Sequence, residues 1–177
     1  MKVLLVSCLL FLFAGSAHAV QLSVAGELNY SKYFGGGALA QPKLGHGAGV
    51  FLDFRSFAVG FQLGAVYMKR ITARDGGGLN TFPFVQLPLA LRLWIGRKVV
   101  LSGGGYWAQG MGSFPSIGVR SYDYGAFGGV TFNFPIAILT AMFFDFRYLH
   151  GLADISSIKG DTTWRDVQCL VGFKFGR

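Results

Sequence analysis

The sequence predicts an all-β fold, an eight-stranded antiparallel up-and-down transmembrane β-barrel. Three observations predict it. Apolar residues recur at every second position along eight stretches of the chain. Only 14% of the 177 residues are charged, whereas about a quarter of a soluble domain is charged. The connections between the stretches alternate between long and short, as expected of barrels that cross a membrane.

The clearest stretch covers residues 136–154, IAILTAMFFDFRYLHGLAD. Its apolar residues do not recur at helical spacing, but a period of two separates them into two faces. One face carries no charge and ends in aromatics, whereas the other holds Asp145 and Arg147 two positions apart. A strand that is apolar on one side and sparsely charged on the other is typical of a transmembrane barrel.

Residues 1–19 have the pattern of a secretory signal peptide, so residues 20–177 are the expected barrel domain. Lys2 supplies the positive start, residues 3–13 the apolar run, and residues 17–19 the small-x-small cleavage pattern. The apolar run is too short to span a bilayer.

Each predicted strand alternates between an apolar face and a face of Gly, Ala and polar residues. Short turns are expected at residues 55–56, 96–98 and at Pro135, and longer loops rich in Gly or polar residues join the other strands. Pro88 cannot donate a ladder hydrogen bond, so it either weakens the prediction of this strand or marks a bulge. The strands are expected at residues 20–33, 44–54, 57–70, 82–95, 99–109, 122–134, within 136–154, and at 163–175.

Aromatic residues gather near both ends of the predicted strands, which indicates two interfacial belts. The belt near the long loops is expected to contain Tyr30, Tyr67, Phe82, Trp107, Tyr122, Tyr124, Tyr148 and Trp164. The belt near the short turns is expected to contain Phe54, Phe57, Trp94, Phe132, Phe134, Phe173 and Phe175.

Two other folds compete with this interpretation. Residues 124–144 lack charge and could form a membrane helix, but the internal FNFP sequence and several glycines favour two strands and a turn. A soluble barrel would turn its apolar faces inward and the other faces to water. Those other faces are too poor in charge for a solvated surface and suit a narrow, filled interior.

Three segments together resemble the small outer-membrane β-barrel family of the opacity-protein, OmpX and OmpA type. They are FFDFRYLHGLADI, which begins at Phe143, QLPLALRLW at residues 86–94, and DYGAFGGVTFNF at residues 123–134. The resemblance implies an outer-membrane barrel that acts structurally or in surface interactions through its external loops. It also implies recognition of the last strand by the barrel-insertion machinery, although Gly176 and Arg177 follow the final aromatic here.

The predicted interior contains three acids and three bases, and buried charges are costly unless they are paired. We therefore expect an interior ion-pair network centred on Glu27, Arg92, Asp145 and Arg147. Structural filling of the lumen is one interpretation, and a narrow pore for small solutes is the alternative. The six inward residues are Glu27, Asp53, Arg92, Asp145, Arg147 and Lys174.

A basic rim is expected on the outer loops. One interpretation is that it contacts the phosphates of lipopolysaccharide. The other is that water simply solvates these charges. A host or surface ligand of the loops is a further possible partner. Binding of nucleic acid is not expected. The barrel is expected to be a monomer. The rim comprises Lys43, Lys69, Arg70, Arg74, Arg120, Lys159 and Arg165, against the acids Asp75, Asp154 and Asp161.

A lipid-modifying hydrolase of the outer membrane is the second alternative function. It would need a nucleophile beside a base, but His46 and His150 have no serine nearby in the sequence pattern, and Ser156 and Ser157 lie in a predicted loop. No metal-ligand cluster or cofactor motif is present. The sequence therefore predicts no enzyme, no catalytic residue, no metal site and no cofactor.

Overall fold

The computed structural model describes residues 19–34, 41–73, 78–111, 121–154 and 163–176. Among them no helix is long and apolar enough to cross a membrane. The eight strands are β1 (Ala19–Phe34), β2 (Gln41–Ser56), β3 (Val59–Ala73), β4 (Leu79–Ile95), β5 (Val99–Gly110), β6 (Tyr122–Ala137), β7 (Thr140–Gly151) and β8 (Thr163–Gly176).

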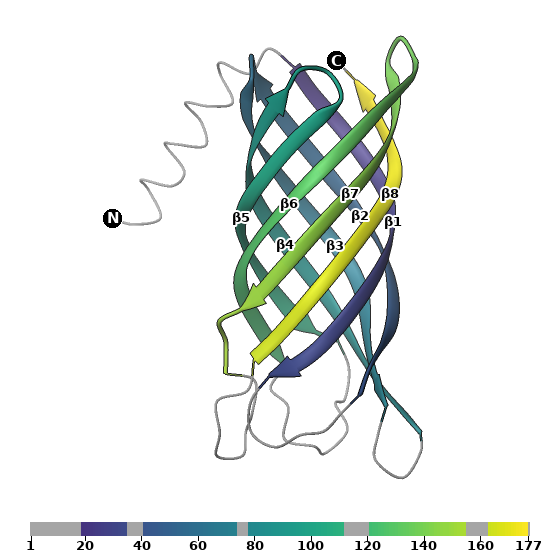
Figure 1. Ribbon diagram of the computed structural model, residues 1–177, viewed down its shortest axis with the longest axis vertical. Helices are drawn as coiled ribbons and strands as arrows, with labels where there is room; N and C mark the ends of the chain where they lie inside the picture. The colour runs from purple at the N-terminus through teal and green to yellow at the C-terminus, as the bar shows by residue number, and fades with distance from the viewer. Residues whose placement is uncertain (1–18, 35–40, 74–77, 112–120, 155–162, 177) are drawn as a thin grey trace, which may run out of the picture.

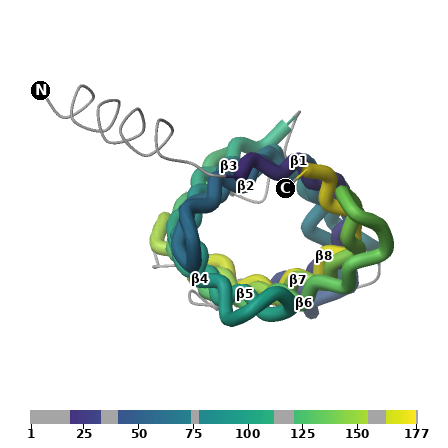
Figure 2. The backbone as a smooth tube through the Cα atoms, turned by 90° about the horizontal axis from the view of Figure 1, so that it is seen from above, coloured from purple at the N-terminus to yellow at the C-terminus, as the bar shows by residue number. Residues whose placement is uncertain are grey.

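The strands form one closed antiparallel barrel in which each strand pairs with the next along the chain. β1 closes the barrel against β8 in a continuous register from Gln21–Gly176 to Phe34–Thr163. Figure 1 shows the strands steeply tilted, and Figure 2 shows the backbone as a single ring. The eight-stranded, up-and-down fold predicted from the sequence is confirmed.

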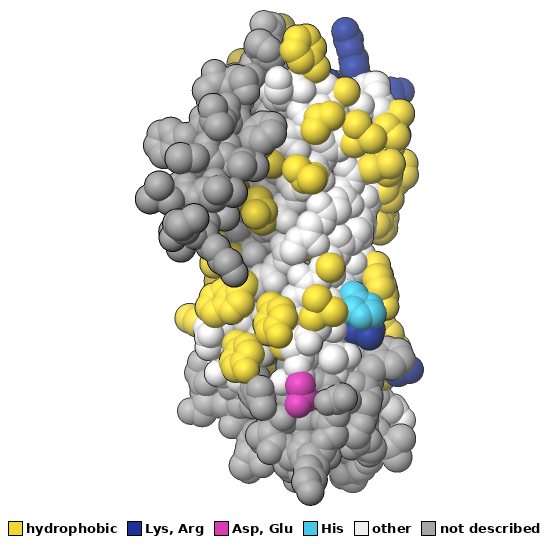
Figure 3. Space-filling view, turned by 90° about the vertical axis from the view of Figure 1, so that its left-hand side faces the viewer, with side chains coloured by type: hydrophobic (Ala, Val, Ile, Leu, Met, Phe, Trp, Pro, Cys, Tyr) yellow, Lys and Arg dark blue, Asp and Glu magenta, His cyan; other side chains and the backbone are white. Residues whose placement is uncertain are grey.

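Side chains alternate between the two sides of the wall, so the period of two separates exterior from interior. The apolar face of every strand points outward: Leu22 and Phe173 are 48% and 46% exposed, for example, and large apolar side chains are exposed on all eight strands. Figure 3 shows hydrophobic side chains gathered in an upper and a lower group on one such face. The soluble-barrel and membrane-helix interpretations are therefore wrong.

Two of the three predicted short turns are displaced. β2 continues to Ser56, and the turn consists of Phe57 and Ala58. Phe57 adopts a φ of 54°, which suits a two-residue hairpin turn, and its carbonyl accepts a hydrogen bond of 2.6 Å from Arg55 Nε. β6 likewise continues past Pro135 to Ala137, so the turn falls at residues 138–139.

Two of the strand prolines, Pro88 and Pro135, lie where a ladder is irregular; the register shift of β2, between Lys43 and His46, involves neither. Pro135 lies at a register shift between β6 and β7, where its missing N–H group is tolerated. Pro88 remains inside β4 without a register shift, contrary to the expected bulge. The β3–β4 pairing is merely interrupted there, between Leu63–Leu89 and Val66–Gln86. A strand can therefore pass through Pro88 because its other neighbour, β5, stays paired.

Most of the predicted belt aromatics point outward, but three do not. Phe82 and Trp164 are buried inside the barrel, and Trp94 is only 6% exposed. Their positions share the parity of the polar interior residues, such as Arg92 beside Trp94 on β4. A position near a strand end therefore does not by itself place an aromatic residue in a belt. The alternation along the strand decides whether its side chain points outward or inward.

Candidate functional site: the barrel interior

All six residues predicted to point inward do lie in the barrel interior. They come from five different strands, and none is more than 4% exposed. A buried charge requires a partner, so the question is which of these residues contact one another. The six residues are Glu27, Asp53, Arg92, Asp145, Arg147 and Lys174.

Four of the six and one glutamine form a continuous polar chain, here called the central cluster (Asp53, Gln62, Arg92, Asp145 and Arg147). Arg92 Nη1 lies 2.8 Å from Asp53 Oδ1, and Arg147 Nη2 lies 2.7 Å from Asp145 Oδ2. Gln62 links the two ion pairs: its Nε2 donates to Asp53 at 3.0 Å, and its Oε1 accepts from Arg147 at 2.7 Å. The cluster therefore ties together β2, β3, β4 and β7.

Aromatic rings sandwich one of the cluster's guanidinium groups. The Arg147 guanidinium carbon lies 5.0 Å from the centre of the Phe51 ring and 5.2 Å from that of Phe127. Cation–π contacts of this kind gain strength where water is excluded. Together the rings and ion pairs fill the lumen at this level, as expected of an eight-stranded barrel.

Glu27 does not belong to the centre of the network. Among the described residues it forms no ion pair, and its Oε1 accepts a hydrogen bond of 3.4 Å from Asn29 Nδ2. Asn29 in turn accepts from Ser31 at 3.3 Å. Glu27 thus joins a ladder of polar side chains along β1 rather than the central cluster.

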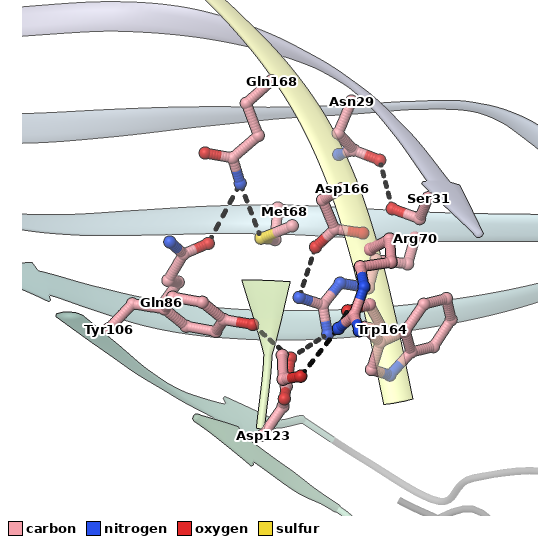
Figure 4. A network of polar contacts seen from close by, with 12 residues as sticks. Asn29, Ser31, Met68, Arg70, Gln86, Tyr106, Asp123, Trp164, Asp166 and Gln168 are labelled. Atoms are coloured by element: carbon pink, nitrogen blue, oxygen red, sulfur yellow. Dashed lines mark hydrogen bonds and ion pairs between the residues drawn. The ribbon is translucent and has the colours of Figure 1, made fainter. Parts of the chain in front are cut away.

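A second cluster, absent from our prediction, lies nearer the long loops. Arg70 Nη1 lies 2.9 Å from Asp123 Oδ2, and its Nη2 lies 2.5 Å from Asp166 Oδ2. The Tyr106 hydroxyl donates to Asp123 at 3.1 Å. The Arg70 guanidinium also lies 4.7 Å from the Trp164 ring centre (Figure 4). We call these residues (Arg70, Tyr106, Asp123, Trp164 and Asp166) the Arg70 cluster.

The placement of Arg70 on an outer loop was therefore wrong. Its side chain is fully buried in the barrel, because β3 extends to Ala73 and position 70 has inward parity. The same alternation would have placed Asp123 and Asp166 inside, since both belong to the polar face of their strands. The signal was therefore present in the sequence, since all three residues lie on the polar face of the predicted strands 57–70, 122–134 and 163–175.

A layer of buried side chains without charge lies in the same interior. Gln168 Nε2 donates to Gln86 Oε1 at 3.0 Å and contacts the Met68 sulfur at 3.6 Å (Figure 4). All three side chains are buried. The interior is thus crossed by hydrogen bonds and ion pairs at several levels, an arrangement that braces the wall.

The remaining rim residues lie on the outer face of the strands or beyond the described ranges. Lys43 is exposed, Lys69 and Arg165 are half-buried, and all three belong to the loop-side ends of their strands. Asp154 follows β7 and is half-buried. Arg74, Asp75, Arg120, Lys159 and Asp161 lie outside the described residues, as do residues 1–18 of the predicted signal peptide.

Both described histidines face outward, away from the polar lumen. His46 pairs with Leu28 and Lys69 across its neighbouring strands, and His150 pairs with Ala126 and Arg165. No cross-strand partner of either carries a hydroxyl, a thiol or a carboxylate. Ser156 and Ser157 lie outside the described residues. Within the described ranges, no group of three or more His, Cys, Asp or Glu residues could hold a metal ion.

No protein-family model matches the sequence, and no curated protein matches it by sequence. Solved structures do match the fold. Ail, the attachment invasion locus protein of Yersinia pestis, solved with the heparin analogue sucrose octasulfate, superposes with a TM-score of 0.55 at 13% identity. That match covers 89% of this chain and 98% of Ail. Neisserial surface protein A superposes with a TM-score of 0.55 at 12% identity, covering 87% and 96% of the two chains.

Proposed function

We propose that this chain is an integral outer-membrane β-barrel that acts structurally or in surface interactions through its external loops. In this proposal residues 1–19 are a signal peptide and residues 20–177 form the barrel. The insertion machinery places the barrel with its short turns in the periplasm and its long loops outside. The single observation that carries the proposal is an apolar exterior on all eight strands around an ion-paired lumen.

The exterior favours a membrane because water would solvate it poorly. Exposed leucine, valine, phenylalanine and tyrosine side chains surround the whole barrel. Soluble monomers rarely expose apolar patches of more than a few hundred Å². A lipid environment stabilises such a wall, and the closed barrel leaves no unpaired strand edge within it.

We infer that the loop-side surface contacts polyanionic glycans, including lipopolysaccharide. Basic side chains lie side by side on the outer face there, in the cross-strand pairs His46–Lys69 and Lys32–Arg165. Sulfates and phosphates accept charge-assisted hydrogen bonds from such groups. The heparin analogue bound to Ail is consistent with this class of ligand on a barrel of the same fold.

Heparin retention of the purified barrel tests this ligand class. The double variant Lys43→Gln and Lys69→Gln should elute from immobilised heparin at lower salt than the unaltered protein. The double variant Arg97→Gln and Lys98→Gln, which removes two exposed charges at the short-turn end, is the matched control and should elute like the unaltered protein. Equal elution of all three proteins would refute the loop-side site.

We further propose that the chain is not an enzyme. Support comes from the two described histidines, which lack an adjacent nucleophile or carboxylate and face away from the polar lumen. Mass spectrometry of lipid A from cells with and without the protein tests the hydrolase alternative. Identical lipid A species are expected; the loss of an acyl chain only when the protein is present would overturn the proposal.

A further inference from the structure

A cavity of about 520 Å³ opens at the short-turn end of the barrel, away from the external loops. Its size is within the range of small-molecule sites. Three basic side chains line it from three separate segments: Arg55 on β2, Arg97 in the β4–β5 turn, and Lys174 on β8. No carboxylate of the described residues lines the cavity, so its polar lining is basic.

Lys174 is the buried member of this lining. It is 4% exposed, and its Nζ makes no hydrogen bond with any described residue. Its nearest acid is Asp53, whose Oδ2 lies 3.8 Å away, beyond hydrogen-bond distance. Asp53 already receives the 2.8 Å contact from Arg92. The ammonium group of Lys174 therefore has donors available for a ligand.

Neighbouring groups support a ligand that carries both charge and an organic part. Asn133 lines the same cavity and is 7% exposed, and its Oδ1 has no hydrogen-bond partner among the described residues. Arg55 is held in place by its bond to Phe57 and lies 5.1 Å from the Trp94 ring centre. Trp94 and Leu139 add apolar surface to the wall.

We propose that this cavity binds a small phosphate monoester, with its phosphoryl oxygens on Arg55, Arg97 and Lys174. Guanidinium and ammonium groups bind phosphate by charge-assisted hydrogen bonds, and a guanidinium can donate two in parallel. The apolar wall contacts the organic part of the ester. The site is distinct from the loop-side surface and does not depend on the ligand proposed there.

The indole N–H of Trp94 is a direct reporter for this site. The chain has three tryptophans; Trp107 faces outward and Trp164 belongs to the Arg70 cluster, so both serve as internal references. The purified protein in a phosphate-free maltoside detergent is titrated with glycerol 3-phosphate while the indole resonances are recorded by NMR. We expect a saturable shift of the Trp94 resonance alone.

Two variants and one control make the test specific. Arg97→Gln and Lys174→Met should each weaken the apparent affinity by at least about tenfold. Arg97 lies in a surface turn, so that variant keeps the test valid if Lys174→Met fails to fold. Lys98→Gln, the neighbouring turn residue that does not line the cavity, should leave the titration unchanged.

The source of the phosphate is distinguished by adding phosphatidic acid, a lipid whose headgroup is a phosphate monoester, to the same micelles at matched phosphate concentration. A saturable Trp94 shift with glycerol 3-phosphate assigns the site to a soluble ester, and a shift with the lipid alone assigns it to a headgroup. Either result supports the proposal. The absence of a saturable shift with both probes, or equal affinities in Arg97→Gln and the unaltered protein, would overturn it.

Discussion

Arg70 on β3 and Asp166 on β8 meet inside the barrel although they lie 96 positions apart in the chain. The guanidinium Nη2 donates to the carboxylate at 2.5 Å, and both side chains are fully buried. β3 and β8 are not neighbours in the sheet, so this ion pair bridges the lumen itself. It fixes the distance between walls that backbone hydrogen bonds do not join.

Removing the basic partner should destabilise the barrel strongly. Arg70→Met leaves Asp123 and Asp166 buried without their cation, and breaking a buried pair in this way costs about 3–5 kcal/mol. Urea titration of the protein folded into lipid vesicles measures the free energy of unfolding. The control, Lys43→Met, changes an exposed charge and should cost below about 1 kcal/mol. Similar losses for both variants would contradict the bridging role.

The Arg147–Asp145 ion pair of the central cluster should show strong coupling in the free energy of unfolding. Arg147→Met and Asp145→Leu each leave one buried charge unpaired, whereas the double variant leaves none from that pair. We expect a coupling energy of about 0.5–3 kcal/mol between the two changes.

A control cycle uses residues from different clusters. Arg147→Met combined with Asp123→Leu joins positions that share no contact in the structure. These two changes should be additive within about 0.5 kcal/mol. Additivity in the Arg147–Asp145 cycle as well would show that the short contact contributes nothing.

Alternation with a period of two was sufficient to predict the fold and the burial of the six interior residues, because parity alone decides the side of the wall. Parity could not show that Gln62 links the ion pairs of Arg92 and Arg147, since that contact depends on the stagger of strands around the barrel. The same stagger separates Glu27 from the central cluster. Arg70 was missed because the end of its predicted strand was assigned to the outer rim, whereas β3 continues to Ala73 and keeps position 70 inside.

The effect of replacing a glycine on the free energy of unfolding should depend on whether that glycine faces the interior or the exterior of the barrel. A Cβ atom on Gly64 would collide with the Phe51 ring, whereas one on Gly26 would meet nothing within 4 Å. Gly64→Val should therefore destabilise the barrel by about 1–3 kcal/mol through overpacking. Gly26→Val should be tolerated. Both are measured by the urea titration, and an equal effect of the two changes would contradict the filled interior.

The blocked lumen should not conduct ions. Ion pairs and aromatic rings cross it at the central cluster, so the purified protein should give no discrete conductance steps in planar bilayers. A sixteen-stranded porin, whose lumen is an aqueous channel, verifies the sensitivity of the recording. Reproducible unitary steps from this protein would favour the narrow-pore alternative instead.

The orientation of the barrel in the outer membrane tests the central claim most directly. In a Cys169→Ala background, Met111→Cys places a thiol at the long-loop end and Ile138→Cys places one in the exposed β6–β7 turn. A membrane-impermeant maleimide is added to intact cells and to permeabilised cells. We predict labelling of the residue 111 thiol in intact cells and of the residue 138 thiol only after permeabilisation. The reverse pattern, or labelling of both thiols in intact cells, would contradict the proposed topology.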